Sequence, residues 1–569
     1  MNTDIKKCIN NPSVTISKIK FNNDYPIELK SDDIVIFVGA NNVGKSRVLK
    51  DIKDDLIESS NKKIIISEIE YKSTNFDKNS VIQFFDRNFN KDQNGNYNVY
   101  IDDSFLSTYS NYSFDHLPDS SKNFYKILYT FLSTENRLNI TAPIFLNQLI
   151  DQYSFNIMNK IESNEKIITL LNGILLSGFE KAIDVYVELL NGTCVKKYKV
   201  GNKIEITDTI NLNSRASKEK LKELEDLNYQ GDGIRSAVAI LASLIVNEHS
   251  LYLIDEPETF LHPPQARLLG RNIVDLSNDK QCFISTHNID LIRGILERNL
   301  SRVKIIKIDR VGNTNEFHVL DNQSITDIAG DKNLKYSNIL NGLFYNKVVL
   351  CENESDCKFY SAILESLDSN TYQNTLFCAV GGKDQFKLII PLLKKLGICY
   401  SIIADIDLIN DKDKLRQLLN AAKPNIYNEI STSHNNFLVE FEEKTESLVK
   451  KQAIIKQEIE KIFTVDEYMS QASADKIKEI IKNINSLKLL KNGGKAIIPS
   501  GKCTVEFNII EKFLNENNIF ILDCGEIERF VPEIDMHGSA WVEEVFKRYK
   551  DINDSIYDKA KEFIKKVFE

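Results

Sequence analysis

DDIVIFVGANNVGKSRVLKDI, residues 32–52, decides the fold of the first half of the chain. Its apolar, β-branched run predicts a buried strand, and the residues after the glycine-rich loop predict a helix. Between them, Gly39–Ser46 matches G-x-x-x-x-G-K-[ST], a loop whose backbone N–H groups hold phosphates at a helix N-terminus. Lys45 would reach the β- and γ-phosphates of a nucleotide, and Ser46 would bind Mg²⁺. The residues expected to hold the nucleotide are Gly39, Asn41, Asn42, Gly44, Lys45 and Ser46.

Two acidic residues end a second apolar run, LYLIDEPE at 251–258. Asp255 would join the Mg²⁺ and nucleotide site, and Glu256 would polarise the attacking water. A third run, QCFISTHN at 281–288, leads to His287, where a histidine can contact a γ-phosphate. Each feature alone has an ordinary structural explanation, but their order after the phosphate loop favours a nucleotide-hydrolysing site.

A glycine-rich turn opens an apolar helix just before the LYLIDE run, in YQGDGIRSAVAILASLI at 229–245. Taken alone, this turn is either a helix N-terminus or part of a binding loop. The order of the four elements, with DEPETFLHPPQ at 255–265, resembles the ABC-type ATPase head of SMC-like proteins. That resemblance implies ATP held between two heads of a dimer. It also implies that Gly231, Gly233 and Arg235 complete the partner's site.

Carboxylates follow predicted strands in the second half of the chain. KVVLCENESD ends a strand with Glu352, and Asp356 follows four residues later; YSIIADIDLIND ends another strand with Asp405 and Asp407. The carboxyl ends of parallel strands share one edge of a sheet. Carboxylate oxygens there can bind hard divalent cations, and a pair of such ions can stabilise a phosphodiester displacement. Solvated strand ends are the alternative interpretation.

A glutamate after one strand and D-x-D after another resembles the TOPRIM domain, and AVGGKDQF at 379–386 fits the turn between them. Asn353 stands where that family usually has glycine, and asparagine tolerates a left-handed backbone better than most residues. An ABC-type head joined to a TOPRIM domain resembles the overcoming-lysogenization-defect (OLD) family, whose members include the Gabija endonuclease subunit and retron-associated effectors. The resemblance implies an ATP-regulated, Mg²⁺- or Mn²⁺-dependent DNA endonuclease in antiviral defence.

IFILDCGEIERFV at 519–531 resembles the late strand and acidic G-x-I-E turn of the OLD family. This implies that Glu526 and Glu528 also bind metal. The family often has a lysine before the turn, where this chain has Asp523 and Cys524.

The missing lysine leaves two functions open. Either Lys495 or Lys502 replaces it in an active nuclease, or the chain is an ATP-driven scaffold whose TOPRIM domain cuts poorly or not at all. A primase or topoisomerase would share the TOPRIM unit, but the sequence has no primase zinc motif. The resemblance further implies a homo-oligomer, a dimer or larger, and leaves open a partner protein or non-coding RNA.

Alternating strands and helices predict the α/β class, with parallel sheets covered by helices on both faces. We expect an N-terminal ABC-type P-loop ATPase head at 1–330 and a C-terminal TOPRIM domain at 340–569. Helical insertions are expected at about 104–192, a candidate dimerisation element, and at about 411–505. Within the first insertion, the helical pattern runs from about 121 to 180.

Composition excludes several classes of protein. No apolar run reaches the roughly 18 residues of a membrane span, and the first twenty residues lack a signal-peptide core. The net charge of −9 gives no basic footprint for nucleic acid, although metal-binding carboxylates would add to it. Nine cysteines without CxxC pairs or zinc spacing argue against structural zinc. We expect a cytoplasmic protein with no membrane partner.

Overall fold

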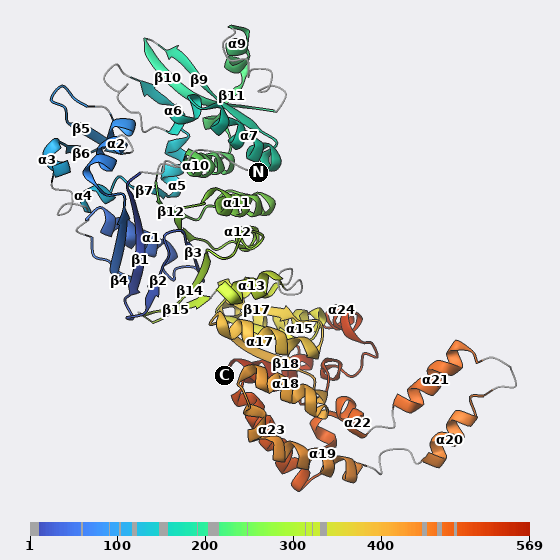
Figure 1. Ribbon diagram of the computed structural model, residues 1–569. Coiled ribbons are helices and arrows are strands. Elements are labelled where there is room, and N and C mark those ends of the chain that lie inside the picture. Colours follow the sequence, from blue (N-terminus) through green and yellow to red (C-terminus); the bar gives the residue numbers. More distant parts are fainter. Residues whose placement is uncertain are drawn as a thin grey trace. The chain divides into compact units, whose positions relative to one another are not determined.

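The computed structural model divides the chain into two compact units, Met1–Tyr336 and Ser337–Glu569. Each unit has its own central sheet (Figure 1). The structure describes residues 11–58, 61–89, 91–101, 104–115, 122–146, 157–190, 192–202, 215–246, 249–312, 314–320, 322–330, 338–445, 452–463, 469–482 and 486–569.

A six-stranded sheet forms the centre of the first unit, in the order β15-β14-β3-β13-β12-β7. Five strands are parallel, and β15 runs antiparallel to β14. The IVIFV residues of β3 are all buried, as expected for a strand covered on both faces. The strands are β3 (Ile34–Val38), β7 (Tyr129–Leu132), β12 (Leu251–Asp255), β13 (Gln281–Ser285), β14 (Val303–Val311) and β15 (Thr314–Leu320).

A smaller antiparallel sheet, in the order β2-β1-β4, shares its core with β3. The rings of Phe21 on β1 and Phe317 on β15 stack with centroids 3.8 Å apart, which ties the two sheets together. The strands are β1 (Ser13–Phe21), β2 (Pro26–Glu28) and β4 (Ile66–Thr74). The helices that follow or connect the central strands are α1 (Lys45–Leu56), α10 (Asp232–Val246), α11 (Pro263–Leu276), α12 (Ile289–Ile295) and α13 (Asn322–Gly330).

The segment at 104–192 differs from the helical insertion that the sequence predicts. Tyr129–Leu132, inside the expected helical stretch, is strand β7 and pairs in parallel with β12. A short apolar run such as YTFL fits a helix and a strand equally well, and the pairing with β12 decides between them. The segment's described elements are β6 (Ser104–Tyr109), α3 (Asn111–Asp115), α4 (Lys122–Tyr125), β7, α5 (Thr134–Ile140), β8 (Ile144–Leu146), α6 (Ile157–Glu162), α7 (Glu165–Phe179) and β9 (Ala182–Leu190).

Two further antiparallel sheets belong to the first unit. β9 and β8 both pair with β10, which also pairs with β11, and β5 pairs with β6. The remaining elements of this region are α2 (Lys78–Asn88), β5 (Tyr97–Ile101), β10 (Thr193–Gly201), α9 (Arg215–Glu223) and β11 (Glu225–Asp226).

The second unit is built on a four-stranded parallel sheet in the order β17-β16-β18-β19. The predicted α/β class with parallel sheets is therefore confirmed in both units. The strands are β16 (Lys347–Cys351), β17 (Thr375–Ala379), β18 (Cys399–Ala404) and β19 (Ile519–Ile521). The helices that accompany them are α15 (Glu354–Leu367), α16 (Ser369–Gln373), α17 (Phe386–Lys395), α23 (Lys502–Glu516), α24 (Gly538–Arg548) and α25 (Asp558–Phe568).

Between β18 and β19 the described residues form helices and turns. These helices are α18 (Lys412–Ala422), α19 (Ser431–Thr445), α20 (Gln452–Glu460), α21 (Gln471–Lys482), α22 (Ser486–Gly493) and the already named α23. Throughout the described part of the chain, no helix has the length and apolar character needed to span a bilayer.

Replacing Phe359 by alanine tests the core of the second unit. Phe359 is fully buried, and its ring lies 5.3 Å from the ring of Trp541, centroid to centroid. We expect Phe359→Ala to lower the free energy of unfolding of this unit by about 3–5 kcal/mol. Trp541 is the chain's one tryptophan, so its fluorescence during urea titration reports this unit. Val505→Ala on α23, where the side chain is 57% exposed, is the control. Equal midpoints for the two variants would contradict this account.

Candidate functional site

The loop at Gly39–Ser46 follows β3 and is closely packed at both of its glycines. Gly39 has φ +143°, and a Cβ there would lie 2.3 Å from the carbonyl oxygen of Ile308. Gly44 has φ +104°, and a Cβ there would lie 2.3 Å from Cδ1 of Ile65. Both positions therefore require glycine. Ser46 lies half-buried in the first turn of α1.

The tip of this loop is exposed to solvent, and the side chain of Lys45 is buried inside the loop. Asn41 and Asn42 are exposed, and Asn42 has φ +63°. Nζ of Lys45 donates hydrogen bonds to the carbonyl oxygens of Gly39, at 2.9 Å, and Ala40, at 2.8 Å. Burial lowers the pKa of Lys45 against the opposing attraction of nearby carboxylates. Those carboxylates belong to Glu256, Glu258 and Asp255.

The acidic pair and the histidine come from the strands next to β3. Strand β13 lies between β3 and β12, so all three carboxyl ends meet at one edge. Ser285 Oγ donates to Asp255 Oδ1. His287 Nδ1 lies 3.3 Å from Oε1 of Glu256, and both side chains are partly exposed. Glu256 has φ +45°, a left-handed conformation that is uncommon outside glycine.

Arg137 is a residue of this site that sequence reasoning missed. It lies on α5, is fully buried, and donates to the carbonyl oxygens of Asp255, at 2.5 Å, and Glu256, at 3.2 Å. Burial lowers the pKa of its guanidinium to about 10. Arg137 thus holds the backbone of the acidic turn, and nothing in the local sequence around it indicates this contact.

Glu258, the last acid of DEPE, was also missed. Its Oε1 accepts hydrogen bonds from Thr286 Oγ1, at 2.7 Å, and from the backbone N–H of His287, at 3.1 Å. Burial raises the pKa of Glu258, and its Oε2 has no hydrogen-bond partner among the described residues. Glu258 therefore positions the backbone of His287, and its place in the quoted motif was a usable signal.

The glycine turn before α10 is shaped by packing at one of its two glycines. A Cβ on Gly233 would lie 2.5 Å from the carbonyl oxygen of Phe260, whereas a Cβ on Gly231 would meet nothing within 4 Å. Arg235 donates to the carbonyl oxygen of Leu138 at 3.2 Å. Packing therefore explains Gly233 but leaves Gly231 without a structural requirement.

In the second unit, Glu352, Asp405 and Asp407 gather at the carboxyl ends of the neighbouring strands β16 and β18. The backbone N–H of Asp405 donates to Oε1 of Glu352 at 3.3 Å. Nζ of Lys383 lies 3.6 Å from that same oxygen and pairs with Oδ1 of Asp407. One lysine from the turn after β17 thus bridges two of the three predicted carboxylates.

A second lysine, Lys491 on α22, reaches the other side of this group. Its Nζ lies 3.0 Å from Oδ2 of Asp405 and 3.6 Å from Oε2 of Glu526. The two lysines proposed from sequence lie elsewhere: Lys495 pairs with Glu511 at 2.6 Å, and Lys502 pairs with Glu440 at 3.0 Å. Those two candidates are therefore wrong as lysines of the carboxylate group.

Asp356 and Glu528 border the group and have structural partners. Oδ2 of Asp356 accepts the backbone N–H of Asn353 at 3.0 Å and caps helix α15. Oε1 of Glu528 accepts the backbone N–H of Gly538 at 2.8 Å. Glu526, Glu528 and His537 offer ligand atoms that all lie within 4.8 Å of one another. His537 did not figure in the sequence analysis.

Burial sets the electrostatics of these carboxylates. It raises the pKa of Glu352 to about 7 and that of Asp356 to about 6, and it raises the pKa of Asp405. Neighbouring carboxylates raise all three further, while Lys383 and Lys491 oppose the rise at Asp405. Converging, half-desolvated oxygens are the donor set that Mg²⁺ or Mn²⁺ prefers, so the residues fit a hard divalent ion.

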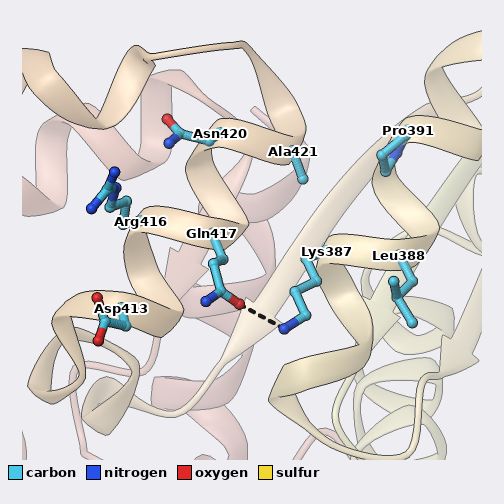
Figure 2. Close-up of a pocket in the computed structure, with 8 residues that line it drawn as sticks. All are labelled: Lys387, Leu388, Pro391, Asp413, Arg416, Gln417, Asn420 and Ala421. Atoms are coloured by element: carbon cyan, nitrogen blue, oxygen red, sulfur yellow. Dashed lines mark hydrogen bonds between the residues drawn. The ribbon is translucent and has the colours of Figure 1, made fainter.

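A groove lies between α17 and α18 (Figure 2). In the chain, α17 begins shortly after Lys383 and α18 begins shortly after Asp407. Lys387 Nζ donates to Gln417 Oε1 at 2.6 Å across the groove. Lys387 is one helical turn beyond Lys383, which contacts the carboxylates. The residues that line the groove are Lys387, Leu388, Pro391, Asp413, Arg416, Gln417, Asn420 and Ala421.

Comparison with known families matches each unit to a separate model. Residues 34–293 match AAA_21, described as "AAA domain, putative AbiEii toxin, Type IV TA system". Residues 343–407 match OLD-like_TOPRIM, described as "Overcoming lysogenization defect protein-like, TOPRIM domain". The chain is therefore similar, over these two segments, to OLD-like ATPase–TOPRIM proteins. The family resemblance expected from its sequence is confirmed.

Two curated proteins that are similar to this chain are both named as nucleases. The OLD-like chain is 24% identical over 321 residues to "Endonuclease GajA" of Bacillus cereus (strain VD045), covering 48% of this chain and 51% of that protein. It is 23% identical over 318 residues to "Old nuclease" of Escherichia phage P2, covering 54% of this chain and 50% of that protein. The chain thus spans about half the length of the curated relatives it matches.

A solved structure of an Smc head bound to the C-terminal winged-helix domain of ScpA is also similar. It has 13% sequence identity and a TM-score of 0.34, and the match covers 55% of the OLD-like chain and 99% of the Smc chain.

Replacing Lys45 by methionine tests the nucleotide loop. The change removes the ammonium that donates to Gly39 and Ala40, and we expect at least about a 10-fold loss of affinity for a non-hydrolysable ATP analogue, equivalent to about 1.4 kcal/mol. Isothermal titration calorimetry measures it. Lys50→Met, at an exposed position of α1, is the matched control. Equal affinity in the two variants would remove Lys45 from the site.

Proposed function

We propose that this OLD-like chain is an ATP-binding and ATP-hydrolysing, metal-dependent DNA endonuclease of bacterial antiphage defence. The observation that carries the proposal is the convergence of Glu352, Asp405, Asp407 and Glu526 around Lys383 and Lys491. The names of the two relatives, an endonuclease and a nuclease, support the same activity.

The first unit would bind and hydrolyse ATP at the edge formed by β3, β13 and β12. Backbone N–H groups of Gly39–Ser46 would hold the phosphates, with Lys45 turning from its loop carbonyls to the β- and γ-phosphates. Ser46 and Asp255 would hold Mg²⁺. Glu256 would orient the attacking water, and His287, 3.3 Å away, would face the γ-phosphate.

The second unit would cut the phosphodiester. Mg²⁺ or Mn²⁺ would supply Lewis-acid stabilisation of the charge that develops on the phosphate. The carboxylates of Glu352, Asp405 and Asp407 would hold the ions, with Asp356, Glu526 and Glu528 at the border of the same site. Lys383 would keep Glu352 and Asp407 together until the ions bind, since it pairs with both.

DNA would approach along the groove between α17 and α18. Lys387, Arg416 and the amides of Gln417 and Asn420 offer donors to backbone phosphates, which fix the position of a strand without reading its sequence. The net charge of −9 is compatible with this, because it is summed over the whole chain and includes both acidic sites.

An ATP-driven scaffold with an inactive TOPRIM domain is the second candidate function. Asp523 and Cys524, in place of the family's lysine, favour it. Under either function we propose a cytoplasmic homo-oligomer, a dimer or larger, with ATP sandwiched between heads that Gly231 and Gly233 complete. A partner protein or non-coding RNA would fit both functions.

A cleavage assay with plasmid DNA and Mg²⁺ or Mn²⁺ separates the two functions. We expect Glu352→Gln to lower the cleavage rate by about 100-fold or more, because several kcal/mol of metal-dependent stabilisation depend on that carboxylate. Glu354→Gln, two residues away and exposed, should cut like the wild type. A wild type that binds ATP but cuts no better than Glu352→Gln would support the scaffold.

The double variant Lys387→Ala/Arg416→Ala tests the path of the DNA. We expect weaker DNA binding for every sequence, and a plot of log affinity against log salt concentration whose slope falls by about 2, since each residue would hold one phosphate. Fluorescence anisotropy of a labelled duplex measures both. Lys512→Ala on α23, where the side chain is 79% exposed, is the control. An unchanged salt slope in the double variant would exclude this groove.

A further inference from the structure

Lys491 occupies a place in the carboxylate group that its position in the sequence does not suggest. It belongs to α22, in the helical region between β18 and β19, yet its Nζ lies between Asp405, at 3.0 Å, and Glu526, at 3.6 Å. These two carboxylates come from turns that follow different strands of the sheet. One ammonium therefore joins the D-x-D turn to the late acidic turn.

Two glycines dock the end of α22 on the turn that precedes Glu526. A Cβ on Gly494, which has φ +57°, would lie 2.3 Å from the carbonyl oxygen of Asp523. A Cβ on Gly525, which has φ +107°, would lie 2.1 Å from the carbonyl oxygen of Lys491 itself. The backbone N–H of Lys495 donates to the carbonyl oxygen of Asp523 at 2.8 Å. The helix end and the turn thus meet backbone to backbone, which only glycine permits at both positions.

Neither residue at the position of the missing lysine supplies a cation; Arg529, which follows Glu526 in the chain, lies 3.4 Å from it, Nε to Oε1. Cys524 Sγ donates to the carbonyl oxygen of Glu526 at 3.4 Å, and the neighbouring residue, Asp523, is acidic. Lys491 therefore reaches the carboxylates from α22, and the end of this helix packs directly against residues 523–525, where the family's lysine is absent.

We propose that Lys491 is a basic residue of the nuclease site, supplied by α22 in place of a lysine at 523–524 and acting beside Lys383. This inference rests on the proposed nuclease function. The ammonium lies beside the oxygens of Asp405 and Glu526, where a phosphodiester held by the metal ions would present its negative oxygens. There it offsets charge that builds up during cleavage, as a preorganised donor does. The site is complete only when α22 is docked.

Moving the lysine tests this proposal. We expect Lys491→Ala to lower the rate of DNA cleavage by about 100-fold. Adding Cys524→Lys to Lys491→Ala should restore at least a tenth of the wild-type rate, because the new side chain starts from the turn on which α22 is docked. Lys495→Ala is the matched control, since Lys495 lies on the same turn of chain but pairs with Glu511.

Mn²⁺ binding, measured by isothermal titration calorimetry, shows whether Lys491 acts as a basic group in cleavage or only maintains the structure of the metal site. We expect Lys491→Ala to bind Mn²⁺ at least as tightly as the wild type, because a competing cation has gone. Two results would overturn the proposal: a Lys491→Ala variant that cuts at the wild-type rate, or one that loses Mn²⁺ binding together with cleavage. A wild type that does not cut at all would remove the nuclease function, and this inference with it.

Discussion

Negative charge gathered at one edge of a parallel sheet is the constraint on which the second unit depends. Burial among neighbouring carboxylates raises the pKa of Glu352 to about 7 and also raises the pKa of Asp405. Lys383 and Lys491 offset this negative charge from two separate elements. The fold around them brings these two cations to the carboxylates, and the glycine contacts of α22 hold Lys491 in place.

The first unit also brings basic residues close to a group of acidic residues, but through different contacts. Lys45 lies among Asp255, Glu256 and Glu258 but is hydrogen-bonded to its own loop, while the buried Arg137 holds the acidic turn by its carbonyl oxygens rather than by its carboxylates. The carboxylate of Glu256, which is partly exposed, therefore remains available to a ligand. Both units thus place carboxylates at the ends of parallel strands and use basic residues to organise them.

The sequence predicts those parts of the structure that depend on local pattern. The phosphate loop, the order of strands and helices, and the meeting of Glu352, Asp405 and Asp407 at one edge follow from strand patterns and the geometry of parallel sheets. Strand β7 and Lys491 could not be predicted, because each is decided by a neighbour far away in the chain. Glu258 lay inside a quoted motif, yet only the fold shows that it holds His287. The chemical roles of all these residues stay predictions.

The segment at 104–192 contributes directly to the first unit through strand β7 and helix α5. β7 forms one edge of the central sheet. Arg137, on the helix that follows β7, donates hydrogen bonds to the backbone carbonyl oxygens of Asp255 and Glu256. Removing this segment would remove one strand of the central sheet together with the side chain that holds the backbone of Asp255 and Glu256. A displacement of the segment would therefore reach the backbone of Asp255 and Glu256 through one side chain, Arg137.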